Sequence, residues 1–185
     1  NATWMACGAA VEPAPGTDGR ARPVMALVPI EAITVLDTWH TTGMRGTGST
    51  DYECHEVFVP WERVVDPSRP LGWSDRPLHR IAVYSLLALA VSSVAVGLGR
   101  RALDEFRSLA ATRTLLGTTR PIATSAVAQT AYARAEARVR SAAAFKDLIV
   151  GEAWDRAQRG PLDRETRRLL RLAATNATFA VAGAI

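Results

Sequence analysis

Residues 37–63 read DTWHTTGMRGTGSTDYECHEVFVPWER, and this stretch separates two kinds of sequence. It starts as a polar loop that contains three glycines, Gly43, Gly46 and Gly48. Glycine permits a tight or left-handed backbone. A run typical of a β-strand follows over residues 52–59, and a proline ends it. Taken alone, the stretch is typical of a polar hairpin loop at the edge of a sheet. Its spacing fits no phosphate-binding loop.

The segment before and within this stretch has the pattern of short β-strands. Residues 3–12 and 23–30 predict two strands, and the Pro-, Gly- and Asp-rich residues between them predict a surface hairpin loop. Residues 33–36 predict a short third strand, and residues 52–59 a fourth. The apolar residues of the fourth do not alternate cleanly, which favours a bulge. Together the four predict part of an antiparallel sheet.

The second half of the chain has helical periodicity. We expect one long helix over residues 78–112, a second over 125–159 and a third over 164–185. Gly160 is placed to end the second helix, and Asp163 is placed to cap the third. One apolar seam follows the second helix, and a shorter one is expected on the third at Leu169, Leu172 and Ala173. Three such helices predict most of a four-helix bundle.

Residues 81–99 contain no charged side chain. The run is long enough to cross a membrane, with arginines at both ends. It is also rich in Ala, Ser and Gly, and the helix continues as a charged amphipathic segment, so burial in a bundle and at a subunit interface is the favoured interpretation. A non-catalytic helical assembly or membrane-anchored module stays as the alternative from another functional class.

The change in composition places a domain boundary after the strands. We expect residues 1–66 to form the C-terminal part of a β-domain, residues 67–77 a linker rich in proline, and residues 78–185 an incomplete helical domain. The fold class is therefore α+β. The chain begins without an initiator Met and stops inside an apolar helical run, so we expect a piece of a longer protein.

Charge and cysteine content narrow the functional classes. The net charge is +4, and Lys146 is the only lysine. The arginines alternate with acids along the helices, as on a solvated helix face, which argues against a nucleic-acid surface. Two cysteines without a secretion signal favour the cytoplasm, and the histidines and cysteines have no metal-ligand spacing. An isolated loop histidine such as His40 is more often structural than catalytic.

The loop also resembles a known family. Residues 43–49 have the form Gly-x-Arg-Gly-[Thr/Ser]-x-Ser, and a strand ending in Val59-Pro60 and a long helix follow. This is similar to the junction between the middle β-domain and the C-terminal helical bundle of acyl-CoA dehydrogenases. The preceding Asp37-Thr-Trp-His brings the chain closer to one branch of that superfamily, the two-component flavin-dependent monooxygenases.

The resemblance implies a flavin site but no catalytic residue in this chain. An Arg-x-x-Phe-Gly segment follows the first bundle helix of the family and contacts the flavin, often across a subunit interface. This chain keeps Arg113 and Gly117 and has Leu116 in place of the aromatic residue. Gln129 matches a glutamine near the cofactor. From the residues alone, Arg113 would instead be an arginine that neutralises a helix C-terminus.

The resemblance further implies an enzyme using reduced flavin (FMN or FAD) and O₂ on an aromatic or heteroatom substrate. A separate flavin reductase and a tetramer or dimer are the expected partners. The enzyme alternative is an acyl-CoA dehydrogenase, which holds its thioester with an arginine midway along the first bundle helix. Ala88 stands at that position here, and no charge lies near it. This departure favours the monooxygenase.

Overall fold

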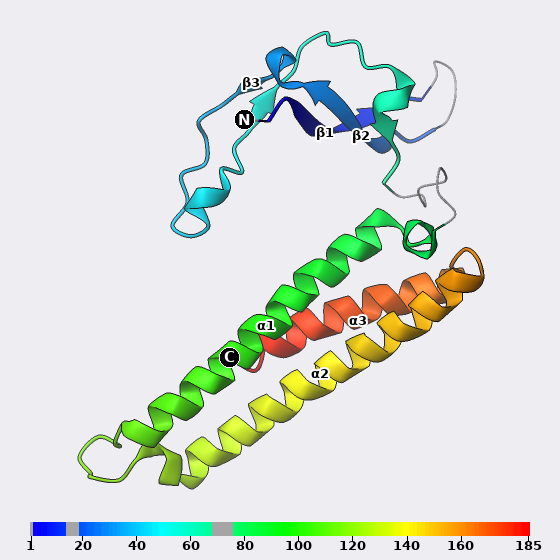
Figure 1. The fold of residues 1–185 in the computed structure, drawn as a ribbon. Helices are drawn as coiled ribbons and strands as arrows, with labels where there is room; N and C mark the ends of the chain where they lie inside the picture. Colours follow the sequence, from blue (N-terminus) through cyan, green and yellow to red (C-terminus); the bar gives the residue numbers. More distant parts are fainter. Residues whose placement is uncertain (1, 14–18, 68–75) are drawn as a thin grey trace. The chain divides into compact units, whose positions relative to one another are not determined.

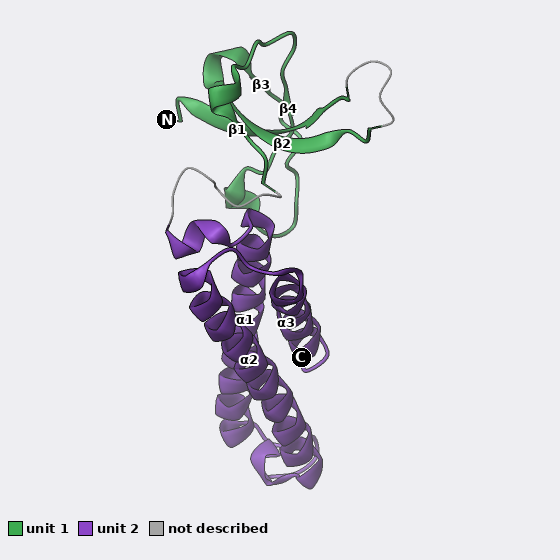
Figure 2. Cartoon of the chain, turned by 90° about the vertical axis from the view of Figure 1, so that its right-hand side faces the viewer, with its two compact units in different colours: residues 1–68 green, residues 69–185 purple. Residues whose placement is uncertain are grey.

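The computed structural model describes residues 2–13, 19–67 and 76–185. It divides the chain into two compact units, residues 1–68 and residues 69–185 (Figure 2). Most of the expected linker, residues 67–77, lies outside the described residues, as does the middle of the expected hairpin loop. Each unit has its own hydrophobic core.

The first unit is an antiparallel sheet built on one long hairpin. Strand β1 (Trp4–Val11) pairs with β2 (Arg22–Pro29) along its whole length, from Trp4 opposite Pro29 to Val11 opposite Arg22. The short β5 (Val64–Val65) adds to the other edge of β2, and β3 (Thr34–Val35) pairs separately with β4 (Tyr52–Glu53). All pairings are antiparallel, so the expected sheet type is confirmed.

The expected strand over residues 52–59 is wrong beyond its first two residues. Regular pairing stops after Glu53, and Glu56 has a φ of 50°, a left-handed backbone that breaks the ladder. Val57 and Val59 nevertheless pack against the core formed by Cys7, Ala26 and Val28. The apolar residues therefore serve packing without continuing the strand.

The glycine-rich loop is held by threonine hydroxyls rather than by glycine conformation alone. Left-handed backbone occurs at Met44 (φ 54°) and Gly48 (φ 55°), but not at Gly43 or Gly46. The loop closes where the Thr38 N–H donates to Thr50 Oγ1 over 3.1 Å. The Asp51 N–H in turn donates to Thr38 Oγ1 over 2.9 Å. Gly43 lies in a bend and Gly46 in the 3₁₀ turn Arg45–Thr47, so the expected tight or left-handed backbone is left-handed only at Gly48.

The second unit consists of three long helices packed side by side (Figure 1). They are α1 (Val83–Thr112), α2 (Ala126–Arg159) and α3 (Arg164–Ala182). Helix α3 packs against both α1 and α2. One buried cluster, around Leu170 and Ala157, lies near the start of α3. A second cluster, around Val96, Val139 and Val181, lies towards its end.

The helix boundaries follow the sequence closely except at the start of α1. Residues 77–80 form a separate 3₁₀ turn (Pro77–Arg80), and the extended residues Ile81 and Ala82 separate it from α1. Arg80 holds this turn against α2 by donating to the carbonyl oxygens of Ala157 (2.8 Å) and Gln158 (3.3 Å). This tertiary contact explains why the helix does not extend back to residue 78.

The cap and seam predictions have mixed outcomes. The Asp163 carboxylate caps α3 by accepting from the Thr166 N–H at 2.7 Å, as expected, and α2 ends at Gly160. On α3, however, Leu172 is 46% exposed, and the fully buried leucine is Leu170. Of the other two residues of the expected seam, Ala173 is fully buried and Leu169 is partly buried against the same cluster as Leu170.

Candidate functional site

The connection between α1 and α2 forms a small hairpin followed by one 3₁₀ turn (Ile122–Thr124). Thr114 pairs with Pro121 as an isolated antiparallel bridge, and the Leu115 N–H donates to the Arg120 carbonyl over 3.0 Å. Gly117 has a φ of 75°, which a glycine adopts without strain, and it lies at the turn of the hairpin. The hairpin surrounds an open, largely polar hollow of about 720 Å³.

Arg113 lies where α1 passes into this hairpin. Its N–H continues the helix by donating to the Leu109 carbonyl (2.8 Å), while its own carbonyl accepts from the Ile122 N–H (2.8 Å). The backbone is therefore fixed on both sides, but the guanidinium is exposed and forms no ion pair with any described residue. A guanidinium that has no ion-pair partner and extends from a backbone held in place can bind a phosphate or another electron-rich group.

Leu116 is fully exposed at the turn, and Gln129 lies in the first turns of α2. The Gln129 amide donates from Nε2 to the Ala123 carbonyl at 2.8 Å, which leaves its oxygen available as an acceptor. Arg113 and Gln129 are thus both fixed to the 3₁₀ segment between the helices. Leu116 offers an apolar contact but no aromatic ring to stack on.

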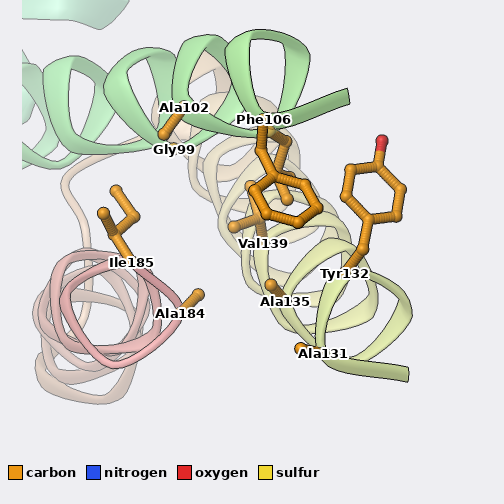
Figure 3. A pocket seen from close by; sticks show the side chains of 10 residues that line it. Gly99, Ala102, Phe106, Ala131, Tyr132, Ala135, Val139, Ala184 and Ile185 are labelled. Carbon is orange, nitrogen blue, oxygen red and sulfur yellow. The ribbon is translucent and has the colours of Figure 1, made fainter. Parts of the chain in front are cut away.

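Two aromatic side chains that the sequence analysis did not single out pack against each other between α1 and α2. Phe106 of α1 and Tyr132 of α2 stack with ring centroids 6.0 Å apart and an interplanar angle of 19°. They line an apolar cavity of about 320 Å³ between α1, α2 and the end of α3 (Figure 3). The Tyr132 hydroxyl points away from the other lining side chains. The cavity can hold a planar apolar group but offers no acid or base.

The same aromatic pair lines a second, smaller cavity of about 190 Å³ together with Gln129. The aromatic stack therefore separates the apolar cavity from the region of the predicted glutamine. No periodic signal in the sequence pairs residue 106 with residue 132, because they lie on different helices. Only the register of α1 against α2 brings them together.

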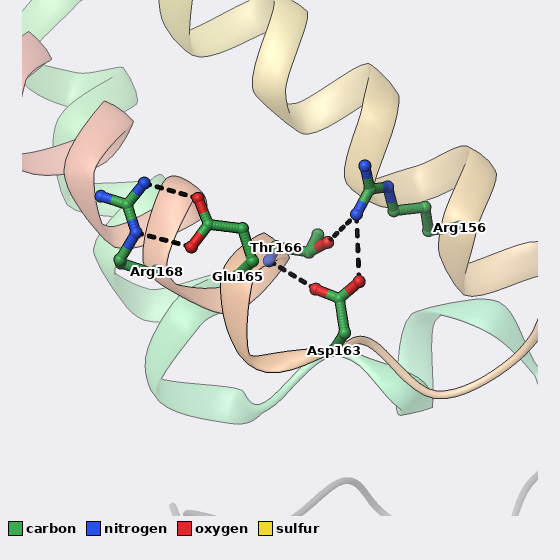
Figure 4. A network of polar contacts seen from close by, with 5 residues as sticks. All are labelled: Arg156, Asp163, Glu165, Thr166 and Arg168. Carbon is green, nitrogen blue, oxygen red and sulfur yellow. Dashed lines mark hydrogen bonds and ion pairs between the residues drawn. The ribbon is translucent and has the colours of Figure 1, made fainter.

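A polar network fixes the start of α3 (Figure 4). The Asp163 carboxylate accepts from the Thr166 N–H, and Arg156 of α2 donates to both Asp163 (3.1 Å) and the Thr166 hydroxyl (2.7 Å). The Thr166 N–H, then its hydroxyl and the nearby guanidinium, hold the pKa of Asp163 below its ordinary value. These contacts join α2 to α3 and are structural.

A neighbouring pair within α3 is bidentate. Arg168 donates from Nε (2.8 Å) and Nη2 (2.5 Å) to the two oxygens of Glu165. The pairing lowers the pKa of Glu165 and raises that of Arg168. Among the residues that the structure describes, no group of three His, Cys, Asp or Glu side chains could hold a metal ion.

Helix α1 has two different faces along its uncharged run. Ser92, Val96 and Gly99 are buried against the other helices. The opposite face exposes a stripe of large apolar side chains at alternating steps of three and four residues: Leu87, Val91, Val94 and Leu98, each 55–64% exposed. By length and composition alone, α1 is the one helix in the described part of the chain that could cross a bilayer.

Comparison with known proteins assigns the class. The acyl-CoA dehydrogenase, C-terminal domain family matches residues 89–185, just over half of the chain. The chain therefore belongs to this family. The antiparallel strands followed by long helices confirm the expected fold class.

Particular relatives are a monooxygenase and the oxygenase component of a hydroxylase. Over 158 residues the chain is 34% identical to an indole-3-acetate monooxygenase of Pseudomonas putida, covering 84% of this chain and 40% of the relative. Over 65 residues it is 40% identical to the oxygenase component of an FADH₂-dependent resorcinol hydroxylase of a Rhizobium species, covering 35% and 15%.

A solved structure extends this likeness over nearly the whole chain. XiaF from a Streptomyces species, in complex with FADH₂ and glycerol, matches with a TM-score of 0.79 and 26% identity. The match covers 98% of this chain and 48% of XiaF. The chain thus spans less than half the length of these relatives.

Proposed function

We propose that this chain is part of a flavin-dependent monooxygenase that uses reduced flavin and O₂ to hydroxylate an aromatic substrate. The observation that carries the proposal is the 34% identity to an indole-3-acetate monooxygenase across both units of the chain. A carboxylate-bearing indole is accordingly the first substrate to test. The two units are proposed to be the end of the middle β-domain (residues 1–66) and the helical domain (residues 78–185), joined by a linker (residues 67–77).

The residues at the α1–α2 connection fit a flavin in part. The exposed, unpaired guanidinium of Arg113 suits a phosphate or the polar edge of the ring. Gln129 retains a free amide oxygen, whereas Leu116 can give only apolar contact. We propose that Arg113 and Gln129 orient the cofactor. When bound, the flavin supplies the oxygen chemistry, and this chain contributes binding and exclusion of water.

The uncharged helix supports a monooxygenase over an acyl-CoA dehydrogenase. The run from residue 81 to 99, most of which lies in α1, carries no charged side chain, and Ala88 stands where the dehydrogenase would carry an arginine for its thioester. An apolar helix favours a pocket from which water is excluded. A polyanionic thioester would gain no charged contact from this run of α1.

The expected partners follow from the same proposal. We propose that a separate reductase provides the reduced flavin, that the protein acts in the cytoplasm, and that it assembles as a dimer or tetramer. The exposed stripe on α1 supports assembly, because large apolar side chains at this spacing are usually covered in a stable assembly.

The deciding experiment supplies the full-length protein with reductase-generated reduced flavin, ¹⁸O₂ and indole-3-acetate. Incorporation of one labelled oxygen atom into the product, dependent on the protein, is the expected result. In parallel, oxidised flavin-bound protein is mixed with acyl-CoA esters without oxygen. Bleaching of the flavin by an acyl-CoA, with no labelled product, would replace the proposal with the dehydrogenase.

A further inference from the structure

The aromatic pair Phe106–Tyr132 joins α1 and α2 at matching distances from their connection. Phe106 lies six residues before Thr112, the last residue of α1. Tyr132 lies six residues after Ala126, the first residue of α2. At about 1.5 Å per residue, each ring is attached roughly 9 Å from the end of its helix. The stacked rings, with centroids 6.0 Å apart, therefore set how far apart the two helices lie just before they connect.

On the connection side of this stack, α1 and α2 contact each other without α3. The smaller cavity beside the stack is lined by α1, α2 and the 3₁₀ turn between them, and no described residue of α3 lines it. On the other side of the stack, Ala184 and Ile185 at the end of α3 line the apolar cavity (Figure 3). The separation of α1 from α2 in their last turns therefore depends on their direct contact.

The stack lies beside the polar groups proposed to orient the flavin. Tyr132 and Gln129 are three residues apart, so they are neighbours on one face of α2, and both line the smaller cavity. The Gln129 amide donates to the Ala123 carbonyl. In the same 3₁₀ turn, the Ile122 N–H donates to the Arg113 carbonyl over 2.8 Å. A change in the spacing of α1 and α2 therefore alters the position of Arg113 relative to Gln129.

The two rings are placed to define spacing more than to stabilise the core. Neither ring belongs to the two buried clusters of the helical unit, and Phe106 is 40% exposed. Aromatic pairs favour a limited range of separation and tilt, so a stack defines the distance between two helices more strictly than aliphatic side chains do. Loss of one ring should therefore disturb the connection more than it lowers the stability of the bundle.

We propose that Phe106 and Tyr132 are positioning residues for the flavin contact: their stack holds α1 and α2 at the separation at which Arg113 and Gln129 reach the same flavin. This inference rests on the proposed function, which assigns Arg113 and Gln129 to the cofactor. Loss of the stack lowers the fraction of molecules in which both groups are in place, and the dissociation constant rises by the same factor. Neither ring needs to contact the flavin.

The test titrates the full-length protein with reduced FMN and with reduced FAD in the absence of oxygen. Thermal unfolding of the flavin-free proteins is measured in parallel. Phe106→Leu and Tyr132→Leu remove the stack, singly and together. Tyr132→Phe keeps the ring and removes only the hydroxyl, which points away from the cavity. Phe145→Leu is the matched control, because it makes the same change at a partly buried ring of α2 that packs against the core cluster around Leu170.

Each leucine variant of the pair should bind flavin about two- to tenfold more weakly, the range that one aromatic pair can contribute. The double variant should bind no more weakly than the weaker single variant, because both changes break the same contact. Tyr132→Phe should bind like the unmodified protein. Phe145→Leu should lower the unfolding midpoint at least as much as Phe106→Leu and leave the dissociation constant unchanged.

Hydrogen exchange gives a second readout that needs no flavin. In Phe106→Leu, the Ile122 amide, which donates to the Arg113 carbonyl, should exchange faster than in the unmodified protein. The amide of Leu170, in the buried part of α3, should keep its exchange rate. An unchanged rate at Ile122 would show that the stack does not hold the connection.

The flavin titrations separate failure of this inference from failure of the proposed function. If the unmodified protein binds reduced flavin and the leucine variants bind it equally well, the positioning role is overturned and the proposed function stands. Losses that add in the double variant, or equal weakening in Phe145→Leu, would also overturn the positioning role. An unmodified protein that binds neither reduced flavin would remove the proposed function and this inference with it.

Discussion

Gly99 of α1 lies directly against Val181 of α3, so closely that a side chain there would press on the valine methyl groups. A Cβ atom on Gly99 would lie 3.0 Å from Val181 Cγ1 and 3.3 Å from Val139 Cγ2. Gly97, two residues earlier on the same helix, has nothing within 4 Å of the corresponding position. The contact between α1 and the end of α3 therefore depends on one glycine and not on its neighbour.

Replacing Gly99 with valine should destabilise the helical unit. The added methyl groups overpack the contact with Val181, which costs about 1–3 kcal/mol relative to the same change at Gly97. Gly97→Val is the matched control, because the change in helix propensity is the same at both sites. Urea unfolding followed by circular dichroism measures the difference. Equal stabilities for the two variants would contradict the tight packing of α1 against α3.

The cap of α3 should make stability depend on acidic pH. Contacts with Thr166 and Arg156 lower the pKa of Asp163 in the folded protein, so the ionised carboxylate stabilises the fold. That contribution is complete above the pKa of Asp163 in the unfolded chain. It is lost as the pH falls through the lower, folded value.

The variants to compare are Asp163→Asn and Asp163→Ala. Asparagine can still accept a hydrogen bond from the Thr166 N–H, so the asparagine variant should keep most of its thermal unfolding midpoint at neutral pH. On acidification, its midpoint should fall less than that of the unmodified protein. Alanine should lower the midpoint at neutral pH. Thermal unfolding from pH 7 to 3 checks both. An unchanged acid dependence in the asparagine variant would assign the pH effect to other carboxylates.

The particular successes and failures of the sequence analysis have physical causes. The Asp163 cap and the end of α2 at Gly160 are local, set by a side chain or backbone within three residues, and the sequence predicted both. The break before α1 depends on Arg80 reaching the end of α2, and the Phe106–Tyr132 stack depends on helix register. Neither long-range contact has a periodic signature.

The candidate site shows the same difference between local features and long-range contacts. Arg113, Leu116 and Gln129 were named from a resemblance in a contiguous segment, and the structure fixes two of them to one short 3₁₀ turn. Their role in flavin binding stays a prediction.

Removing the guanidinium of Arg113 should weaken flavin binding. Loss of one charge-assisted hydrogen bond costs about 1.5–3 kcal/mol, or roughly 10- to 150-fold in Kd. Arg120→Ala is the control, since it removes an exposed arginine from the same hairpin. Titration of Arg113→Ala with reduced FMN and reduced FAD measures the effect. Unchanged dissociation constants would leave Arg113 as an arginine that neutralises the end of α1.

The exposed stripe on α1 should be covered by protein in the assembled molecule. Val91 and Val94 lie at its centre, each 64% exposed on this chain. Glutamate at both positions would place two charges in an apolar contact, where unpaired charge is strongly disfavoured. The double variant should therefore sediment as a smaller species than the unmodified protein.

Ser108→Glu is the control for this variant, because it adds a charge to the exposed, already charged end of the same helix. It should sediment like the unmodified protein. Sedimentation velocity without detergent distinguishes protein contact from a membrane. An unmodified protein that stays in solution only with detergent would show that the stripe faces lipid. An unchanged size for the double variant would show that the stripe lies outside the assembly contact.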